Sequence, residues 1–442
     1  MIAIKKGMDM TLTPAGYRPR LVDPLIDDML KRFGCVSIEG TKYCGKTWTA
    51  RTHCNSMYAL DDSSQNYRNH TLASIDMNYA LEGEPPHLID EWQMIPAIWD
   101  GVRRDVDMSG SKGKYILCGS SVPIRPGVDD IQTHSGMGRI VPIRMRTMSL
   151  FESGDSDGNV SMSGLFDGEF KNTPIKDVNL EDLIRLTMRG GWPGIIDNEP
   201  DDLRGGMPGY VDALCERDLP RIDPGKDQER MKRLIRSLAR NESTLASIKT
   251  ISNDMKENED DTIKDTTVSN YIDALDRMFL IENQPAYSPN IRSSKRIGKK
   301  PKRHLSDPAI GISALGLTKD MLFKDLNTYG FFFEGMCERD LQIYAQSVGG
   351  KLFHYREGNN EVDAIVEMPD RRWGMFEIKL GTNQVDEAAD NMTRIADSLE
   401  NSVESGSGWM APSFMCVLCG VCSAAYRRED GVYVVPITSL RN

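Results

Sequence analysis

Short apolar runs alternate with helix-like stretches over roughly the first third of the chain. Three of these runs, CVSIEG, PHLIDE and KYILCGSS, have the length of buried strands and end in small or polar residues. This rhythm predicts an α/β domain built on a parallel sheet. Because ligands gather at the carboxyl ends of parallel strands, the polar residues that end these runs are the first candidates for chemistry.

The pattern becomes helical after residue 178. LEDLIRLTMRGGWPGII and MKRLIRSLARNEST carry apolar residues three and four positions apart, as amphipathic helices do. DTTVSNYIDALDRMFLIENQPAYSP predicts a capped helix and a short strand, which suits either a winged helix or a plain helical subdomain. Residues 153–175, rich in Gly, Ser and Asp, predict an exposed excursion.

The last third of the chain follows a basic stretch, IRSSKRIGKKPKRH, that contains no acidic residue. Such a stretch is a candidate for phosphate contacts, although lysines in loops are usually only solvated. The sequence then predicts a helix in GFFFEGMCERDLQIYAQSV and strands in LFHYREG, EVDAIVEM and WGMFEIKLG. A further helix is expected in VDEAADNMTRIADSLE, with late strands in FMCVLC and GVYVVPI.

The loop after the first buried strand matches the Walker A spacing in full. Glycines let backbone N–H groups turn toward phosphate oxygens, Lys46 would reach the terminal phosphates, and the Thr47 hydroxyl would ligate Mg²⁺. The predicted ATP-binding residues are Gly40, Thr41, Lys42, Tyr43, Cys44, Gly45, Lys46 and Thr47. The expected cofactors are therefore ATP and Mg²⁺.

Further polar residues follow the other predicted strands. Asp90 suits the Mg²⁺ shell together with Thr47, and Glu91 suits the general base that orients the attacking water. Ser120 or Ser121 is a candidate sensor of water or the γ-phosphate, with a simple turn as the alternative. Arg139 is a candidate to reach a phosphate from its own or a neighbouring subunit, with a surface arginine as the alternative.

Tyr17 and Arg20 precede the loop and are candidates for contacts to the base.

These motifs also carry a family resemblance. IEGTKYCGKT, LIDEWQ, CGSS, GRIVPIRMRTMSLFE and GGWPG occur in this order, and together they resemble the prokaryotic AAA-type ATPases with a C-terminal domain of unknown function. The resemblance implies an AAA-like P-loop ATPase domain in residues 1–177, a helical and winged-helix domain in 178–290, and a restriction-endonuclease-like α/β domain in 291–442. Thr-Lys-Tyr-Cys fills the loop where such proteins often have Pro, Arg and Gln, which leaves the role of Lys42 open.

The last domain offers a possible nuclease-like site. Glu377 and Lys379 lie two apart on a predicted strand and therefore face the same side. Asp363 on the preceding strand and Glu334 on the preceding helix would add carboxylates for a divalent metal. This resembles the D…ExK pattern of restriction-endonuclease-like enzymes. The alternatives are a solvated strand face with a salt bridge, and a fold that persists after cleavage is lost.

The bulk composition limits the partners. The formal net charge of -11 argues against a protein coated in nucleic acid by bulk attraction. No apolar run reaches the about 18 residues of a membrane span, and the start lacks a signal core. Nine mostly scattered cysteines fit reduced thiols, so a cytoplasmic location is expected.

The sequence as a whole predicts a Mg²⁺-dependent ATPase that binds ATP and ADP, with DNA as a candidate partner. A homo-oligomer, either a ring or a dimer, follows if Arg139 acts across an interface. Two alternatives stay open. One is an ATP-gated nuclease that uses the C-terminal site, and the other is a nucleotide-dependent protein-binding switch with slow hydrolysis.

Overall fold

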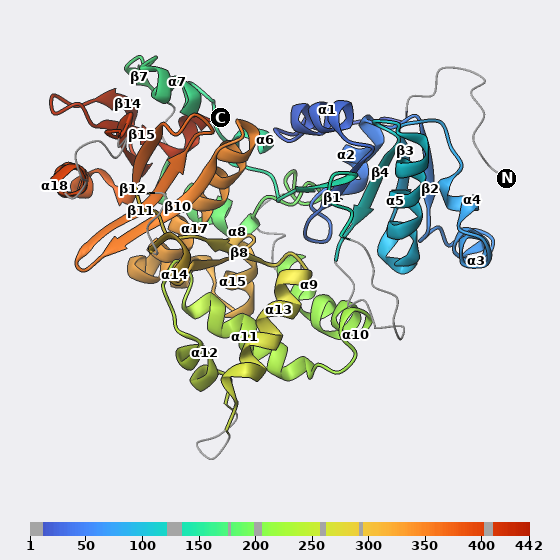
Figure 1. Cartoon of the computed structure of the whole chain (residues 1–442). Helices are drawn as coiled ribbons and strands as arrows, with labels where there is room; N and C mark the ends of the chain where they lie inside the picture. The colour runs from blue at the N-terminus through green and yellow to red at the C-terminus, as the bar shows by residue number, and fades with distance from the viewer. Residues whose placement is uncertain are drawn as a thin grey trace. The chain divides into compact units, whose positions relative to one another are not determined.

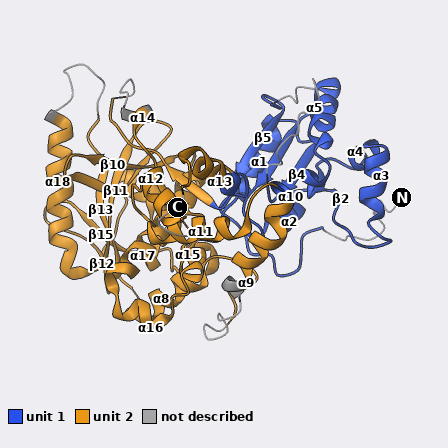
Figure 2. Cartoon of the chain, turned by 90° about the horizontal axis from the view of Figure 1, so that it is seen from below, with its two compact units in different colours: residues 1–147, 221–224, 274–280 blue, residues 148–220, 225–273, 281–442 orange. Residues whose placement is uncertain are grey.

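The computed structural model forms two compact units, which Figures 1 and 2 display. Unit 1 comprises residues 1–147, 221–224 and 274–280, and unit 2 comprises residues 148–220, 225–273 and 281–442. The structure describes residues 12–121, 135–175, 178–198, 206–256, 262–290, 295–401 and 410–442. The predicted division at residues 177 and 290 stays a prediction.

Unit 1 is built on a parallel sheet of five strands in the order β2-β3-β4-β1-β5. The three strands expected from the apolar runs are confirmed as β1, β3 and β4. Since all five strands run the same way, their carboxyl ends meet at one edge of the sheet. The elements are α1 (Asp23–Arg32), β1 (Cys35–Glu39), α2 (Lys46–Thr52), β2 (Ser56–Ala59), α3 (Arg68–Ile75), α4 (Asn78–Leu81), β3 (His87–Asp90), η1 (Trp92–Met94), α5 (Ala97–Ser109), β4 (Tyr115–Gly119) and β5 (Ile140–Arg144).

Both faces of this sheet are covered, which explains why its strands are apolar runs without alternation. Ile116 and Cys118 of β4 join a core cluster with residues of α1 and α2. Tyr115 and Leu117 of the same strand join a second cluster with residues of α5. Successive residues of a strand point to opposite faces, so one strand contributes to both cores.

Unit 2 contains a seven-stranded mixed sheet in the order β10-β11-β12-β13-β15-β14-β7. Strands β12, β13 and β15 are parallel to one another, and the other neighbours are antiparallel. The predicted late strands are thereby confirmed as β10 to β13 and β15. The strands of unit 2 are β6 (Val160–Ser161), β7 (Thr173–Pro174), β8 (Ile281–Gln284), β9 (Lys302–Leu305), β10 (Lys351–Glu357), β11 (Asn360–Glu367), β12 (Trp373–Gly381), β13 (Phe414–Val421), β14 (Ala424–Arg427), β15 (Tyr433–Pro436) and β16 (Leu440–Arg441).

The helices of this part of the chain include the predicted ones, with different ends. Helix α8 stops at Arg189 and does not continue through GGWPG, because Gly190 takes a positive φ of 68°. The helices are α6 (Leu150–Ser153), α7 (Met162–Asp167), α8 (Leu180–Arg189), α9 (Gly206–Ala213), η3 (Leu214–Asp218), α10 (Leu219–Ile222), α11 (Gln228–Arg240), α12 (Ile248–Asp254), α13 (Asp265–Arg277), α14 (Lys295–Gly298), α15 (Pro308–Ala314), α16 (Lys319–Lys324), α17 (Leu326–Ser347), η4 (Thr382–Gln384), α18 (Val385–Asn401) and η5 (Ile437–Ser439).

The expected exposed excursion at residues 153–175 is wrong. This segment forms α7, whose Leu165 and Phe166 are buried, and its two short strands pair with β14 and β16 near the end of the chain. The abundance of Gly and Ser was misleading because these residues cap and end α7: Ser161 is its N-cap and Gly168 its left-handed C-cap.

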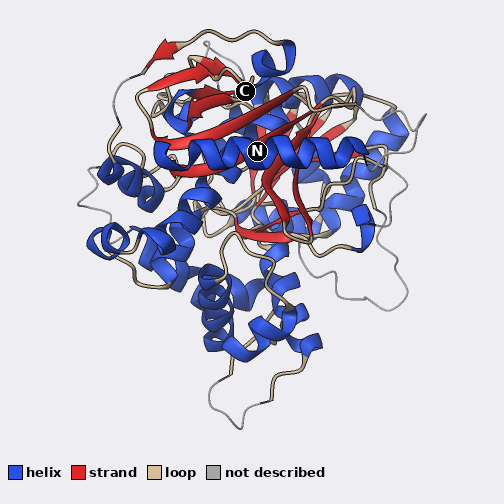
Figure 3. Cartoon of the chain, turned by 90° about the vertical axis from the view of Figure 1, so that its left-hand side faces the viewer, coloured by secondary structure: helices blue, strands red, loops and turns tan. Residues whose placement is uncertain are grey.

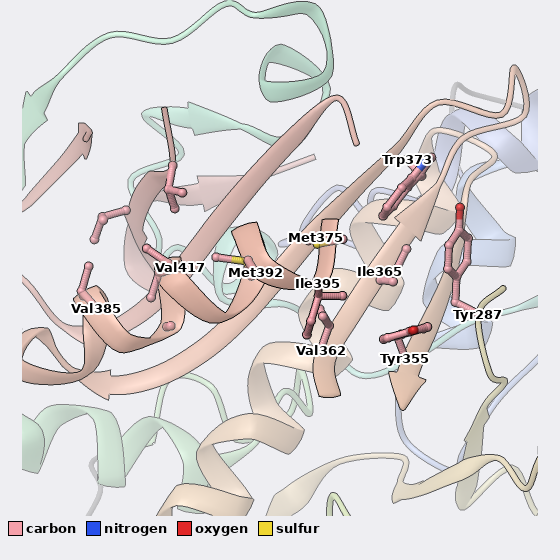
Figure 4. Close-up of a cluster of buried hydrophobic side chains, with 14 of the residues drawn as sticks. Tyr287, Tyr355, Val362, Ile365, Trp373, Met375, Val385, Met392, Ile395 and Val417 are labelled. Carbon is pink, nitrogen blue, oxygen red and sulfur yellow. The ribbon is translucent and has the colours of Figure 1, made fainter. Parts of the chain in front are cut away.

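Helices cover both faces of the sheet in unit 2. Helix α18 lies along one face (Figure 3), where it contacts β11, β12 and β13. Figure 4 shows Met392 and Ile395 of this helix packed against Val362, Ile365 and Met375 of the strands. Burying each such side chain contributes about 1.5–3 kcal/mol to folding. Helix α17 contacts β10, β11 and β12 and is buried along most of its length.

Among the helices in the described ranges, none combines the length and the apolar character needed to cross a bilayer.

Candidate functional sites

The phosphate loop joins β1 to α2 at the carboxyl edge of the unit 1 sheet. Gly45, the N-cap of α2, has a φ of 106°, a conformation that favours glycine. Lys46 is buried, and its ammonium group donates a hydrogen bond to the Thr41 carbonyl oxygen at 2.9 Å. The predicted lysine therefore points back into its own loop, where a phosphate would be held.

Gly40 is required by a close approach of two backbones. A Cβ atom at this position would lie 2.0 Å from the carbonyl oxygen of Met145, which follows β5. Any side chain here would displace the loop or the end of β5. The first glycine of the motif is thus explained by packing behind the loop.

Thr47 and Asp90 lie together, as the sequence predicted. The Thr47 hydroxyl donates to Oδ1 of Asp90 at 3.3 Å, and Asp90 ends β3 two strands away from β1. Burial raises the pKa of Asp90 to about 7, and the negative charges of Glu91 and Asp61 add to this effect. A buried carboxylate among like charges is a position where a cation stabilises the charged form.

Glu91 is held in a strained conformation beside two polar side chains. Its φ is 54°, in the left-handed region that costs a residue other than glycine about 1–3 kcal/mol. The amide of Gln93 donates to the Glu91 carboxylate and lies 3.4 Å from the Ser120 hydroxyl. Because β4 lies between β1 and β3, Ser120 follows the strand between the phosphate loop and Glu91.

Gln93 was not predicted, although it belongs to the quoted DEWQ motif. The signal that was available is its position two residues after the expected base, on the turn η1. Gly119 supports this arrangement, since a Cβ atom there would lie 2.8 Å from both Trp92 Nε1 and Gln93 Oε1.

Arg139 does not join these residues within the chain. It precedes β5, and its carbonyl oxygen accepts from Cys35 N at the start of β1, so it lies at the amino edge of the sheet. Its guanidinium is half exposed and pairs with Asp107 of α5 at 2.5 Å. Only a role in a neighbouring subunit remains for it as a prediction.

Tyr17 and Arg20 make hydrogen bonds within unit 1, and their expected contacts to the base stay a prediction. The Tyr17 hydroxyl donates to Asp23 at 2.8 Å and lies 3.0 Å from the Thr49 hydroxyl of α2. Arg20 is buried and donates to backbone carbonyl oxygens, beginning with that of Cys44 in the phosphate loop. Arg20 thus contacts the phosphate loop itself, and Tyr17 contacts the helices on either side of it in the sequence.

Comparison with known proteins agrees with this geometry. Residues 32–153 match a family model described as an AAA domain. This match identifies residues 32–153 as an AAA-type domain. Two family models described as domains of unknown function match residues 180–321 and 329–440 of the chain. No curated protein matches it at a significant level.

Solved structures show only distant likeness to this chain. The Walker-type ATPase PABY2304 of Pyrococcus abyssi shares 11% identity with a TM-score of 0.43, over 69% of this chain and 99% of that chain. The replication initiator DnaA bound to AMPPCP and single-stranded DNA shares 13% identity with a TM-score of 0.27, over 58% of this chain and 86% of that chain. At these scores neither likeness bears on function.

In unit 2, the four predicted nuclease-like residues are brought into one polar cluster. Lys379 lies 2.7 Å from Glu377 Oε2 and 3.5 Å from Asp363 Oδ2. Burial and the neighbouring Asp363 raise the pKa of Glu377 to about 8. Burial likewise raises the pKa of Glu334 to about 8, against the opposing effect of Lys302.

Lys302 of β9 supplies positive charge to this cluster. Its buried ammonium group pairs with Glu334 and, at 2.9 Å, with Glu338, which follows Glu334 by one turn of α17. Burial alone would lower the pKa of Lys302, but these two carboxylates raise it well above its usual value. Among the described residues, no group of three or more His, Cys, Asp or Glu side chains is arranged to hold a metal ion. The divalent metal expected here stays a prediction; in the structure Lys302 and Lys379 are the cations that pair with these carboxylates.

The cluster continues through His304. Its Nδ1 lies 3.0 Å from Glu242 and its Nε2 lies 2.9 Å from Glu338. In the described part of the basic stretch, Lys302 and His304 are buried and Arg296 pairs with Glu367 at 3.0 Å, while Lys300 is exposed. The expected phosphate contacts of this stretch stay a prediction. Residues 291–294 of that stretch lie outside the described residues. Strands β8 and β9 form a two-stranded antiparallel sheet, which places Lys302 and His304 two residues apart on one face.

Proposed function

We propose that this chain is a Mg²⁺-dependent ATP hydrolase whose site is the carboxyl edge of the unit 1 sheet. The observation that carries the proposal is the convergence of Lys46, the Thr47–Asp90 pair and Glu91 at the ends of β1 and β3. Phosphoryl transfer needs positioned charge more than covalent chemistry, and these groups supply it.

The residues fit a magnesium ion bound together with a nucleotide. Mg²⁺ keeps several waters and takes only one or two protein oxygens when phosphates supply the rest. The Thr47 hydroxyl and the buried Asp90 carboxylate are 3.3 Å apart and offer this small set. The ion would neutralise phosphate charge; Thr47 and Asp90 would hold it.

The remaining groups divide the work of hydrolysis. Lys46 exchanges the Thr41 carbonyl oxygen for an oxygen of the terminal phosphate, and the N–H groups of residues 40–47 surround the phosphates. Glu91 accepts a proton from the attacking water and orients it. Gln93 fixes the Glu91 carboxylate and connects it to Ser120, which lies between the base and the loop.

The macromolecule on which ATP turnover acts is tested by its effect on the rate. DNA as the partner predicts that hydrolysis rises when duplex or single-stranded DNA is added, with Lys46→Ala as the inactive control. A rate that ignores DNA favours a protein partner and a nucleotide-dependent switch. An ATP-gated nuclease predicts Mg²⁺-dependent nicking that is lost in Asp363→Ala and in Lys379→Ala.

A further inference from the structure

The phosphate loop is backed by the three residues that follow β5. Met145 N donates to the Glu39 carbonyl oxygen at 2.6 Å, just before the loop begins. Its own carbonyl oxygen lies against Gly40, where no Cβ atom would fit, and 3.7 Å from Cys44 Sγ. The segment thus contacts the loop at Gly40 and again at Cys44.

A single buried guanidinium ties the loop to the same segment. Arg20 donates from one terminal nitrogen to the Cys44 carbonyl oxygen at 2.9 Å. The other terminal nitrogen donates to the carbonyl oxygens of Arg146 at 2.9 Å and Thr147 at 3.2 Å. Arg20 is only 5% exposed, and charge-assisted bonds are strong where water is excluded.

The hydrogen bond from Arg20 to the Cys44 carbonyl oxygen determines the direction of the Gly45 N–H group in the phosphate loop. The Cys44 carbonyl and the Gly45 N–H belong to one planar trans peptide, so they point in opposite directions. Holding the carbonyl on Arg20, behind the loop, directs the Gly45 N–H away from Arg20 and toward the concave side. Gly45 with its positive φ has no side chain that would fix this peptide plane, so the orientation depends on outside bonds.

We propose that Arg20 is a positioning residue for phosphate binding, which orients the Cys44–Gly45 peptide and couples it to residues 145–147. This inference rests on the proposed function, because it deepens the role of the same site. A lysine cannot replace the planar fork, since its ammonium group does not donate in two fixed directions at once.

Residues 145–147 are the last residues of unit 1 before the chain continues into unit 2. The chain passes from unit 1 into unit 2 between Thr147 and Met148. Within unit 2 the next residues are also fixed: Met148 N donates to Gly191 O at 2.7 Å, and Leu150 N donates to Asp340 Oδ2 at 2.9 Å. A change in the loop on nucleotide binding is therefore expected to reach the last residues of unit 1 through Arg20.

The first test is MgADP binding by titration calorimetry to full-length wild type, Arg20→Lys and Arg32→Lys. Arg32 is the matched control because it is exposed on α1 and pairs only with Asp28 among the bonds described for it. Arg20→Lys should weaken MgADP binding about tenfold or more, while Arg32→Lys should stay within about twofold of wild type. A purely structural Arg20 would lower the melting temperature and leave the affinity of the folded protein unchanged, which would overturn the proposal.

Different results would contradict the proposed nucleotide site and the positioning role of Arg20. If wild type does not bind MgADP, or Lys46→Ala binds it equally well, the proposed function fails. If wild type binds, Lys46→Ala does not, and folded Arg20→Lys binds like wild type, only the positioning role fails.

If Arg20→Lys does not fold, a measurement on the wild type tests the coupling between residues 40–47 and 145–147. Hydrogen–deuterium exchange should slow in residues 40–47 and 145–147 together when MgADP is added. Peptides from α5, which carries none of these contacts, serve as the reference. Slower exchange in 40–47 with none in 145–147 would overturn the coupling.

Discussion

The ammonium group of Lys46 donates a hydrogen bond to the carbonyl oxygen of Thr41, and both residues belong to the phosphate loop. In this arrangement a buried cation lies where a phosphate would bind and is held by a neutral acceptor. A phosphate oxygen carries negative charge and makes the stronger bond to the same donor.

Replacing Lys46 should remove the bond from its ammonium group to the phosphate. We expect Lys46→Ala to weaken MgATP binding by about a hundredfold or more, because a charged hydrogen bond in a buried site is lost together with its Coulomb attraction. Equilibrium titration with a slowly hydrolysed analogue measures this. The comparison variant is Lys42→Ala, since the Lys42 ammonium group lies over the Tyr43 ring, 5.4 Å from its centroid. Equal losses in both variants would contradict the assignment.

Gly40→Ala should act through the backbone behind the loop. The new Cβ atom would lie 2.0 Å from Met145 O, so the loop or the end of β5 must move. We expect a loss of about 1–3 kcal/mol in the free energy of unfolding of unit 1, with nucleotide affinity falling as well. Calorimetric unfolding and titration report the two effects.

The control for this change is Gly209→Ala, on the helix α9. A Cβ atom there would meet no heavy atom within 4 Å, so the substitution should be neutral or stabilising by about 0.5–1 kcal/mol. A Gly40→Ala protein as stable as wild type and with the same affinity would show that the close approach is relaxed easily.

Much of this site follows from the sequence. The parts that do not follow have two different causes. Apolar runs that end in polar residues place Lys46, Asp90 and Glu91 at strand ends, and strand ends of a parallel sheet converge. Arg139 was misplaced because the sequence does not say at which end of a strand a flanking residue matters: it precedes β5, while Arg146 and Thr147 follow it. Arg20 was missed as a support because its acceptors are backbone carbonyls, which leave no pattern in side-chain types.

The cluster in unit 2 shows the same limit at longer range. The D…ExK spacing correctly predicted that Glu377 and Lys379 share a face of a strand. It did not predict Lys302, which comes from β9 in a stretch that looked like a solvated basic loop. The charge of a cluster depends on residues far apart in the sequence, so spacing alone does not distinguish a metal site from a set of ion pairs.

Lys302→Met should destabilise unit 2 strongly. The substitution leaves Glu334 and Glu338 buried without their shared cation, which typically costs about 3–5 kcal/mol. Thermal unfolding of the full chain measures the loss. Lys300→Met, on the exposed residue two positions earlier, should change the free energy of unfolding by about 0.5 kcal/mol or less. A stable Lys302→Met protein that binds Mg²⁺ would support the predicted metal site in unit 2.

The stability of unit 2 should depend on pH through His304. Burial alone would lower the pKa of His304, but Glu338 and Glu242 raise it from 6.5 to about 10, with Gln284 and Lys302 as the other polar neighbours. A raised folded-state pKa contributes stability that is complete below pH 6.5 and is lost as the pH rises toward 10.

Unfolding free energies across this pH window test the contribution of His304. Wild type should lose on the order of a few kcal/mol from pH 6.5 to 10, and His304→Gln should lose clearly less. The matched control is His70→Gln, on the partly exposed helix α3, which should keep the wild-type slope. An unchanged slope in His304→Gln would assign the pH dependence to other groups.

The most direct test of the central claim is phosphate release from MgATP by wild type and by Glu91→Gln under the same conditions. Gln keeps the size of the side chain and its contact with Gln93 but cannot accept the proton of the attacking water. We predict that wild type turns ATP over and that Glu91→Gln binds ATP with similar affinity but hydrolyses it about 10²–10⁴ times more slowly. Equal rates in the two proteins, or no turnover by wild type, would contradict the assignment of this site as an ATPase centre.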